Sequence, residues 1–194
     1  MEKNNDTKER IIQTAARLFQ QQGYNATGLN QIVKESSAPK GSLYYYFPNG
    51  KEELGVAAVR LIQDNIEYRI RSYLAKEKNA VQAVQALIRA TAQAVIRMEW
   101  INFCTVSLIA LETNQKSEPL REACHEANAA WARAFADKLL DSGFVKEQAE
   151  ELGILIQIIV DGALINSLSL NDTRPLHIAA ERIPALLQSG MQKN

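Results

Sequence analysis

The chain has 194 residues, of which 46% are hydrophobic and 23% are charged, so it is long enough and apolar enough to bury a substantial core. Lys plus Arg and Asp plus Glu number 22 each; the net charge of zero excludes a strongly basic nucleic-acid binder but leaves room for a local basic patch. The two cysteines and two histidines have no metal-binding or disulfide pattern, and we predict no metal and no cofactor.

Neither the N-terminal segment nor the longest apolar run indicates a membrane protein. The polar start, MEKNNDTKER, lacks the apolar segment of a signal peptide. The longest apolar run, about residues 152–170, is interrupted by Gln157, Asp161 and Asn166, and we interpret it as a buried helix. These features predict a cytoplasmic protein that does not contact a membrane.

Apolar residues recur with helical spacing along nearly the whole chain, and few segments alternate with period two. The sequence therefore predicts an all-α protein. The first helix is expected over about residues 7–22. Asp6 or Thr7 is suited to cap its start, and Gly23 is suited to its end.

Two short helices are expected next, separated by a tight break. Thr27 is predicted to cap the first of them, over residues 28–34. Pro39 fits the first turn of the second, where its missing N–H costs nothing, and this helix is expected to end near Phe47.

A long fourth helix is expected to continue to about residue 76. Asn49 and Glu52 have the spacing of a capping box at its start. Further helices are predicted over residues 80–98, 104–112, 119–141, 146–170 and 175–187.

The third predicted helix contains three adjacent tyrosines and should divide into two sides. On a helical wheel Leu43 and Phe47 lie together as an inward anchor, with Tyr46 at their border. The residues expected to face outward are Gly41, Ser42, Tyr44 and Tyr45. Hydroxyls, the Lys40 ammonium and the free amides of a helix start all donate hydrogen bonds to phosphate.

Together with the preceding helices, this segment predicts a helix-turn-helix whose last helix enters the DNA major groove. From this helix alone, an alternative stays open, in which the tyrosines only cover an apolar edge and keep their hydroxyls in water.

Residues 7–54 contain A-x-x-L-F in the first helix, G-Y-x-A-T in the next turn, K-G-[ST]-L-Y-Y-x-F in the third helix and K-E-E-L at the start of the fourth. This set resembles the N-terminal domain of TetR/AcrR-family transcriptional regulators. The stretches GLNQIVKES, APKGSLY and FPNGKEEL further resemble the LmrA/YxaF-like branch, which includes regulators of multidrug-efflux genes. Two positions depart from the pattern: Pro39 where many members have Ser or Thr, and Tyr46 where many have His.

The resemblance implies a helix-turn-helix domain over residues 1–50 and a helical ligand-sensing and dimerisation domain over residues 51–194. It implies DNA contacts from Thr27, Lys40, Gly41, Ser42, Tyr44, Tyr45, Tyr46 and Lys51. Residues 1–54 carry seven Lys or Arg against six Asp or Glu, so we expect DNA binding to depend only shallowly on salt.

The segment ELGILIQIIVDGALINSL is apolar on nearly every side and needs cover all round. We expect the last two helices to pair with their mates in a homodimer, the alternative being that both are ordinary core. The predicted dimerisation residues are Ile154, Ile158, Asp161, Gly162, Ile165, Leu176, Ile183 and Leu187. Gln157 and Asp161 are expected to find hydrogen-bond partners in this packing.

The middle helices are expected to surround a ligand pocket, which would be mostly apolar and aromatic with few polar groups. The predicted lining residues are Met98, Trp100, Phe103, Cys104, Leu108, His125, Asn128, Trp131 and Phe135. For each of them, ordinary core packing is the alternative. Both cysteines are interpreted as small buried apolar residues rather than redox sensors.

The residues and the resemblance together predict a ligand-responsive DNA-binding regulator, and the resemblance implies its release from a palindromic operator by a small aromatic or drug-like molecule. Repression rather than activation follows from the family resemblance alone. An enzyme is not predicted, because there is no Ser/His/Asp set, no paired Glu-x-x-His and no Gly-rich phosphate loop. A protein–protein adaptor that docks its partner on the tyrosine-rich helix is the remaining alternative, and retention on DNA separates the two.

Overall fold

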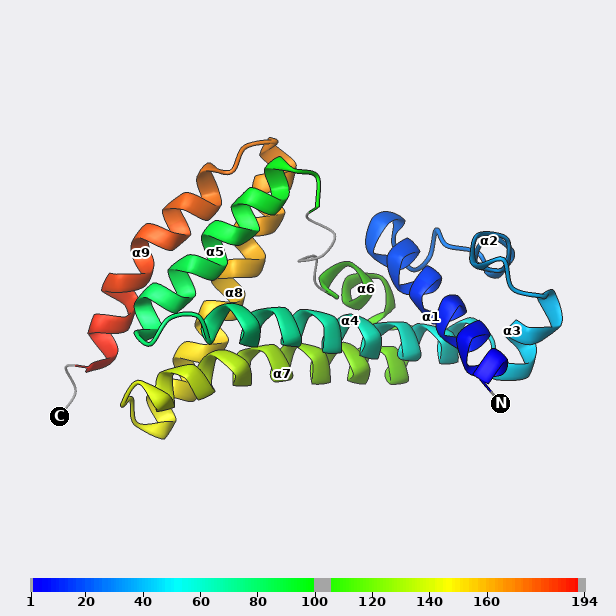
Figure 1. The fold of residues 1–194 in the computed structure, drawn as a ribbon, viewed down its shortest axis with the longest axis horizontal. Coiled ribbons are helices and arrows are strands. Elements are labelled where there is room, and N and C mark those ends of the chain that lie inside the picture. The colour runs from blue at the N-terminus through cyan, green and yellow to red at the C-terminus, as the bar shows by residue number, and fades with distance from the viewer. Residues whose placement is uncertain (1, 100–105, 192–194) are drawn as a thin grey trace. The chain divides into compact units, whose positions relative to one another are not determined.

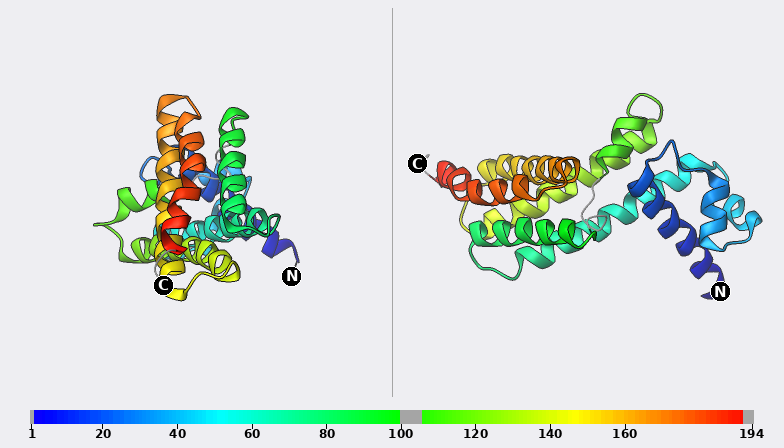
Figure 2. Two further views of the ribbon diagram at one scale, coloured as in Figure 1. Left: turned by 90° about the vertical axis from the view of Figure 1, so that its left-hand side faces the viewer. Right: turned by 90° about the horizontal axis from the view of Figure 1, so that it is seen from above.

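The computed structural model describes residues 2–99 and 106–191, and all regular structure over these residues is helical, as predicted. The chain divides into two compact units, Met1–Asp64 with Thr105–Ala127 and Asn65–Cys104 with Asn128–Asn194. Figure 1 and Figure 2 show the helices of both units.

The first unit forms around its N-terminal helix, which packs against the two short helices that follow. Ile11, Leu18 and Phe19 form the buried stripe of that helix. Burying such a side chain stabilises the fold by about 1.5–3 kcal/mol, so this stripe anchors the unit. The helices that contribute to the unit are α1 (Glu2–Gln22), α2 (Leu29–Ser36), α3 (Lys40–Tyr46), the start of α4 (Lys51–Leu74), α6 (Ser107–Thr113) and the start of α7 (Glu118–Asp141).

The start of α1 differs from the prediction. The helix begins at Glu2, so Asp6 and Thr7 lie inside it and do not cap it. Asp6 instead forms an ion pair with Arg10 one turn later. The end is as predicted: Gly23 has a φ of +89°, which favours glycine, and its N–H donates to the Phe19 carbonyl at 3.0 Å.

Thr27 does not cap α2, contrary to the prediction. The N-cap residue is Gly28, and Thr27 is buried with its hydroxyl donating to the Gly23 carbonyl at 2.7 Å. The hydroxyl of Thr27 therefore closes the turn between α1 and α2. The residue that caps the C-terminal end of α2 is Ser37, whose φ of +53° lies in the left-handed region.

The second unit contains the remainder of α4 and α7 together with α5 (Ala80–Ile96), α8 (Lys146–Leu170) and α9 (Arg174–Met191). α9 contacts both α5 and α8, and Figure 1 shows these three helices side by side. Gly153 brings α8 close to α7, because an added Cβ would lie 2.5 Å from the Ala132 carbonyl oxygen. A larger residue at this position would push the two helices apart.

Most helix boundaries in the later part of the chain fall within a few residues of the prediction. The predicted helices over 80–98, 119–141, 146–170 and 175–187 correspond to α5, α7, α8 and α9. The predicted helix over 104–112 begins outside the described residues, and α6 is described from Ser107 to Thr113.

A proline lies inside α9 without breaking it. Pro184 has no N–H, so the carbonyl of Ala180 loses its usual helical donor. The side-chain amide of Gln85 on α5 donates to that carbonyl at 2.9 Å. The neighbouring helix thus satisfies the group that the proline leaves unpaired.

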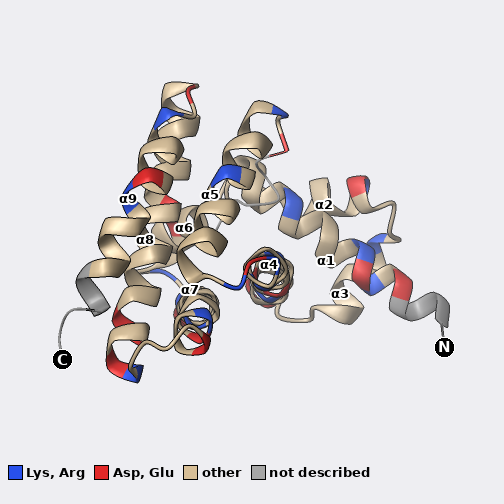
Figure 3. Ribbon diagram, turned by 60° about the vertical axis from the view of Figure 1, so that its left-hand side comes forward, with Lys and Arg blue, Asp and Glu red and all other residues tan. Residues whose placement is uncertain are grey.

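The apolar helix α8 is only partly covered by its own chain. Among the described residues, α8 is the helix that is long and apolar enough to cross a membrane, and 28% of its apolar window is buried. Figure 3 shows few charged residues along its later turns. Within one chain α8 is therefore not the buried helix that its composition indicates.

Candidate nucleic-acid interface

The inward side of α3 is fixed as the helical wheel predicts. Leu43 is 0% exposed and Phe47 is 2% exposed. The N–H of Phe47 donates to the Leu43 carbonyl at 2.8 Å and closes the helix end. Pro39 occupies the N-cap position with an extended ψ of 136°, which starts the helix without a side-chain cap. α3 contacts both α1 and α2, so its orientation is set by the core.

The outward side of α3 is open. Tyr44 and Tyr45 are 50% and 74% exposed. No atom lies within 4 Å of a Cβ added at Gly41, so the backbone there is accessible to a partner. Exposed aromatic rings with hydroxyls beside an accessible backbone suit contacts to base edges and phosphates.

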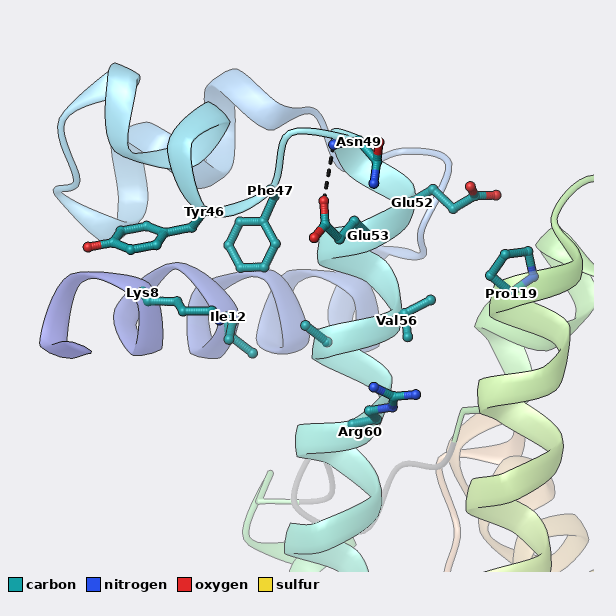
Figure 4. A pocket seen from close by; sticks show the side chains of 11 residues that line it. Lys8, Ile12, Tyr46, Phe47, Asn49, Glu52, Glu53, Val56, Arg60 and Pro119 are labelled. Carbon is teal, nitrogen blue, oxygen red and sulfur yellow. Dashed lines mark hydrogen bonds between the residues drawn. The ribbon is translucent and has the colours of Figure 1, made fainter. Parts of the chain in front are cut away.

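Three further residues complete the predicted contact face. Lys40 is exposed, whereas Ser42 and Tyr46 are half-buried. The ring of Tyr46 meets that of Tyr45 edge to face, with 5.0 Å between centroids. Figure 4 shows Tyr46 and Phe47 extending from the end of α3 toward α1, so α1 lies behind this edge of the predicted contact face.

Polar contacts hold α2 against α1, and they also fix the turn that leads from α2 into α3. Arg17 of α1 pairs with Glu35 of α2 at 2.6 Å, and the hydrogen bond from Arg17 lowers the pKa of Glu35. Arg10 donates from Nε to the Ser36 carbonyl at 3.4 Å. Both contacts lie at the C-terminal end of α2, so they fix the point where the chain turns into α3.

Two of the predicted DNA contacts are engaged within the unit. Thr27 is buried, and its hydroxyl also accepts a hydrogen bond from Gln22 at 3.1 Å. Lys51 is half-buried, with Nζ 4.3 Å from the centroid of the Tyr24 ring, and burial lowers the pKa of this lysine. The accessible part of the predicted set lies on α3.

The start of α4 is capped by a different residue from the one predicted. The N–H of Asn49 donates to Oε2 of Glu53 at 3.0 Å, as Figure 4 shows. Glu52, the predicted partner, instead accepts a hydrogen bond from the Ser117 hydroxyl at 2.5 Å. α4 begins at Lys51, so the third helical position is residue 53 rather than 52.

A groove of about 440 Å³ opens in the first unit beside the end of α3 (Figure 4). Ile12, Phe47 and Val56 contribute apolar surface to it, and Lys8 and Arg60 contribute positive charge. It is open to solvent rather than enclosed, unlike the concave pockets that bury most of a small ligand.

The residues predicted to line a ligand pocket lie in different surroundings. Trp131 and Phe135 are one turn apart on α7 and buried, and Asn128 is half-buried one turn before Trp131. The exposed members of the set are Met98, Leu108 and His125. Trp100, Phe103 and Cys104 lie outside the described residues. The part of the set that the structure brings together is therefore on α7.

Gln157 of α8 joins this α7 stretch, although it was not among the predicted lining residues. Its amide donates to Asn128 at 3.1 Å and to Asp161 at 3.0 Å. The sequence predicted that Gln157 would find a hydrogen-bond partner in the packing of the last two helices. Local spacing could not show that one of its partners would be Asn128 on α7.

The predicted dimerisation residues divide between surface and core. Ile154, Ile158 and Ile165 are exposed along α8. On the same helix, Asp161 and Gly162 are half-buried, and no atom lies within 4 Å of a Cβ added at Gly162. In contrast, the three α9 members of the set are buried in the core of the second unit, so they are not available on the surface; these are Leu176, Ile183 and Leu187.

Cys124 is buried, and its burial raises the pKa of the thiol to about 11. Over the described residues, no group of three or more His, Cys, Asp and Glu could hold a metal ion.

The packed α1–α2–α3 core with its accessible α3 defines a helix-turn-helix DNA-binding protein. The family "Bacterial regulatory proteins, tetR family" matches residues 11–64. "Transcriptional regulator LmrA/YxaF-like, C-terminal domain" matches residues 80–182, more than half of the chain. The chain therefore belongs to the TetR family of transcriptional regulators, in its LmrA/YxaF-like branch, as the sequence motifs indicated.

Similar proteins agree with this assignment over nearly the full length. The HTH-type transcriptional regulator YxaF of Bacillus subtilis is 46% identical over 188 residues, covering 97% of this chain and 98% of that protein. The regulator LmrA of the same organism is 41% identical over 183 residues, covering 94% and 97%. The crystal structure of Escherichia coli NemR in its reduced form shares the fold, with a TM-score of 0.81 at 23% identity over 92% of this chain and 95% of that chain.

Proposed function

We propose that this regulator is a repressor that binds a palindromic operator as a homodimer and leaves it when a small aromatic or drug-like molecule binds. The observation that carries the proposal is the two-sided α3: Tyr45 is largely exposed, whereas Leu43, two residues earlier, is fully buried. Core packing accounts for the buried side of α3. It does not involve the hydroxyl-rich side, which is accessible to a partner. The protein acts in the cytoplasm, where it reaches DNA, and no enzymatic activity is proposed.

DNA recognition is assigned to the exposed face of α3. Lys40 at the helix start neutralises phosphate, and Tyr44 and Tyr45 reach base edges or phosphates in the major groove. Gly41 lets the helix backbone come close to the DNA. In a homodimer, the two copies of α3 enter successive major grooves about 34–36 Å apart, which requires a two-fold symmetric operator.

The test begins by selecting duplexes from a random-sequence library with the unmodified protein. Lys40→Ala and Tyr45→Ala are each expected to weaken binding to the selected duplex by about tenfold or more, since such contacts are worth roughly 1–3 kcal/mol. Lys78→Ala, an exposed lysine outside α3, serves as the matched control and should bind normally. Unchanged binding by both α3 variants, with circular dichroism intact, would refute the assigned face.

The homodimer is proposed on the apolar surface of α8. Ile154, Ile158 and Ile165 recur along one helix and are exposed within the chain. Apolar surface of this kind on a soluble chain marks an interaction site. Gly162 lies between two of these isoleucines with open space where its Cβ would be, which lets the α8 of a second copy come close.

The ligand site is proposed on α7 and α8 of the second unit. Trp131 and Phe135 supply aromatic surface, and the amides of Asn128 and Gln157 supply hydrogen-bonding groups. A ligand acts by preferring the state that does not bind DNA, and a coupling of about 1–3 kcal/mol corresponds to a loss of affinity of roughly 5–150-fold.

A panel of planar aromatic compounds tests this site. A compound that releases the protein from its selected duplex should also quench tryptophan fluorescence in a Trp100→Phe background, where Trp131 is the emitting residue. Asn128→Ala is expected to weaken both effects together. Release from DNA with unchanged Trp131 fluorescence would place the ligand elsewhere.

A further inference from the structure

A carboxylate from α6 reaches the turn between α1 and α2. Glu112 accepts the N–H of Asn25 on Oε2 at 2.8 Å, a contact between residues 87 positions apart in the sequence. Its other oxygen is pressed against Gly23, because a Cβ added there would lie 2.6 Å from Oε1. α6 thus contacts the turn that sets the direction of α2, although it lies far from the helix-turn-helix in the sequence.

The same turn is held from α4. The Nζ of Lys51 lies over the ring of Tyr24 at 4.3 Å from its centroid. Gly55, one turn further along α4, packs so closely that an added Cβ would lie 2.9 Å from Cε2 of Tyr24. Burial lowers the pKa of Lys51, and the nearby charge of Glu112 acts against this by favouring the ammonium form.

These contacts give Lys51 a partner inside the protein. If its ammonium moved out to a phosphate, the Tyr24 ring would lose its cation and the Glu112 carboxylate would lose a nearby positive charge. Lys40, in contrast, is exposed, and it forms no ion pair with the other described residues. The two lysines at the starts of α3 and α4 therefore have different surroundings.

We propose that Tyr24, Lys51 and Glu112 form a turn clamp that positions the helix-turn-helix for DNA, and that Lys51 acts through Tyr24 instead of neutralising a phosphate. In this assignment Lys51 and Glu112 are positioning residues, and the phosphate contact comes from Lys40. The inference rests on the proposed DNA-binding face of α3.

The salt dependence of binding to the selected duplex separates the two roles. Each phosphate that the protein neutralises contributes about 0.9 to the slope of log K against log salt, so Lys40→Ala should reduce the slope of the dimer by about 2. Lys51→Met should lower the affinity by a similar factor at every salt concentration and leave the slope unchanged. Lys51→Arg should restore the affinity, because a guanidinium also lies well on an aromatic ring.

A reduction of the slope by Lys51→Met equal to that of Lys40→Ala would overturn the assignment. If Lys40→Ala has no effect on binding or slope, the proposed DNA-binding face fails instead, and the clamp is decided by a measurement without DNA.

That second measurement is hydrogen exchange at the Asn25 amide in the full-length protein. Glu112→Ala removes the acceptor and should speed exchange at this amide by about tenfold or more, in line with the loss of a protecting hydrogen bond. Glu112→Gln keeps an acceptor oxygen and should leave the exchange rate close to that of the unmodified protein. Glu118→Ala, which removes an exposed acid on α7, is the matched control. Unchanged exchange at Asn25 in Glu112→Ala would overturn the clamp.

Discussion

Leu43 and Tyr45 lie two residues apart on α3 in opposite surroundings, and this contrast leads to a prediction about stability. Leu43→Ala removes a fully buried side chain and should lower the free energy of unfolding by about 2–5 kcal/mol. Tyr45→Ala acts on an exposed side chain and should change it by less than about 1 kcal/mol. Urea denaturation measures both. Similar losses for the two variants would contradict the two-sided helix.

The buried thiol of Cys124 leads to a second prediction. Burial raises the pKa of this thiol to about 11, so almost no reactive thiolate is present at neutral pH. In a Cys104→Ser background, a disulfide-exchange reagent should leave the folded protein unmodified at pH 8 and modify it fully in denaturant. The slow reaction with folded protein should become steadily faster as the pH rises and should level off only above the pKa of the thiol, near 11. Rapid modification at pH 8 would show that the thiol is accessible or activated.

Residue environments were predictable from the sequence where they depend on local periodicity. The spacing of Leu43 and Phe47 was enough to predict the buried side of α3. The engagement of Lys51 was not predictable, because it depends on Tyr24 and on Glu112, which is far away in sequence. A family motif identifies such a position, but not what its side chain contacts in this chain.

At the scale of the element, α9 shows how two helices share one hydrogen bond. Gln85 donates to the Ala180 carbonyl, which Pro184 leaves without a helical donor. Gln85→Ala should lower the free energy of unfolding by about 0.5–1.5 kcal/mol in the unmodified protein. In a Pro184→Ala background, α9 satisfies this carbonyl itself, and the same substitution should cost much less. A double-mutant cycle by urea denaturation measures the difference, and additive effects would contradict the coupling.

Helix existence was predictable from the apolar spacing, whereas the start of each helix was not. The missed caps at α1, α2 and α4 share a cause, since each depends on a start that is shifted by one or more residues. Asn49 donates to Glu53 rather than Glu52 because the chain enters α4 at Lys51. A turn closed by the Gly50 N–H on the Phe47 carbonyl at 2.9 Å precedes this start, and local sequence does not fix a helix boundary to the residue.

For α8, composition predicted cover on all sides, but a single chain leaves Ile154, Ile158 and Ile165 exposed. The same sequence pattern fits a core helix, a membrane span and an interface, because each of these removes apolar side chains from water. Asp161, half-buried and bonded to Gln157, argues against lipid on that part of the helix. For this transcriptional regulator, we propose that a second copy of the chain covers this face.

At the scale of the whole molecule, the α8 interface and DNA binding should fail together. Ile158→Glu places a charge in the middle of the proposed interface, where burying it without a partner is costly, and should convert the dimer into a monomer in sedimentation equilibrium. Because a dimer binds both operator halves at once, a monomer should bind the selected duplex about 10²–10⁴-fold more weakly.

Tyr68→Glu tests whether that loss comes from the interface or from added negative charge. Tyr68 is an exposed aromatic residue on α4, so this substitution changes the net charge by the same amount away from α8. It should leave the dimer intact and affect DNA binding much less than Ile158→Glu. If Ile158→Glu remains dimeric, two-fold pairing through this face of α8 is wrong. If it becomes monomeric and still binds the full duplex tightly, the paired half-sites are wrong, because one copy of α3 would then supply the whole affinity.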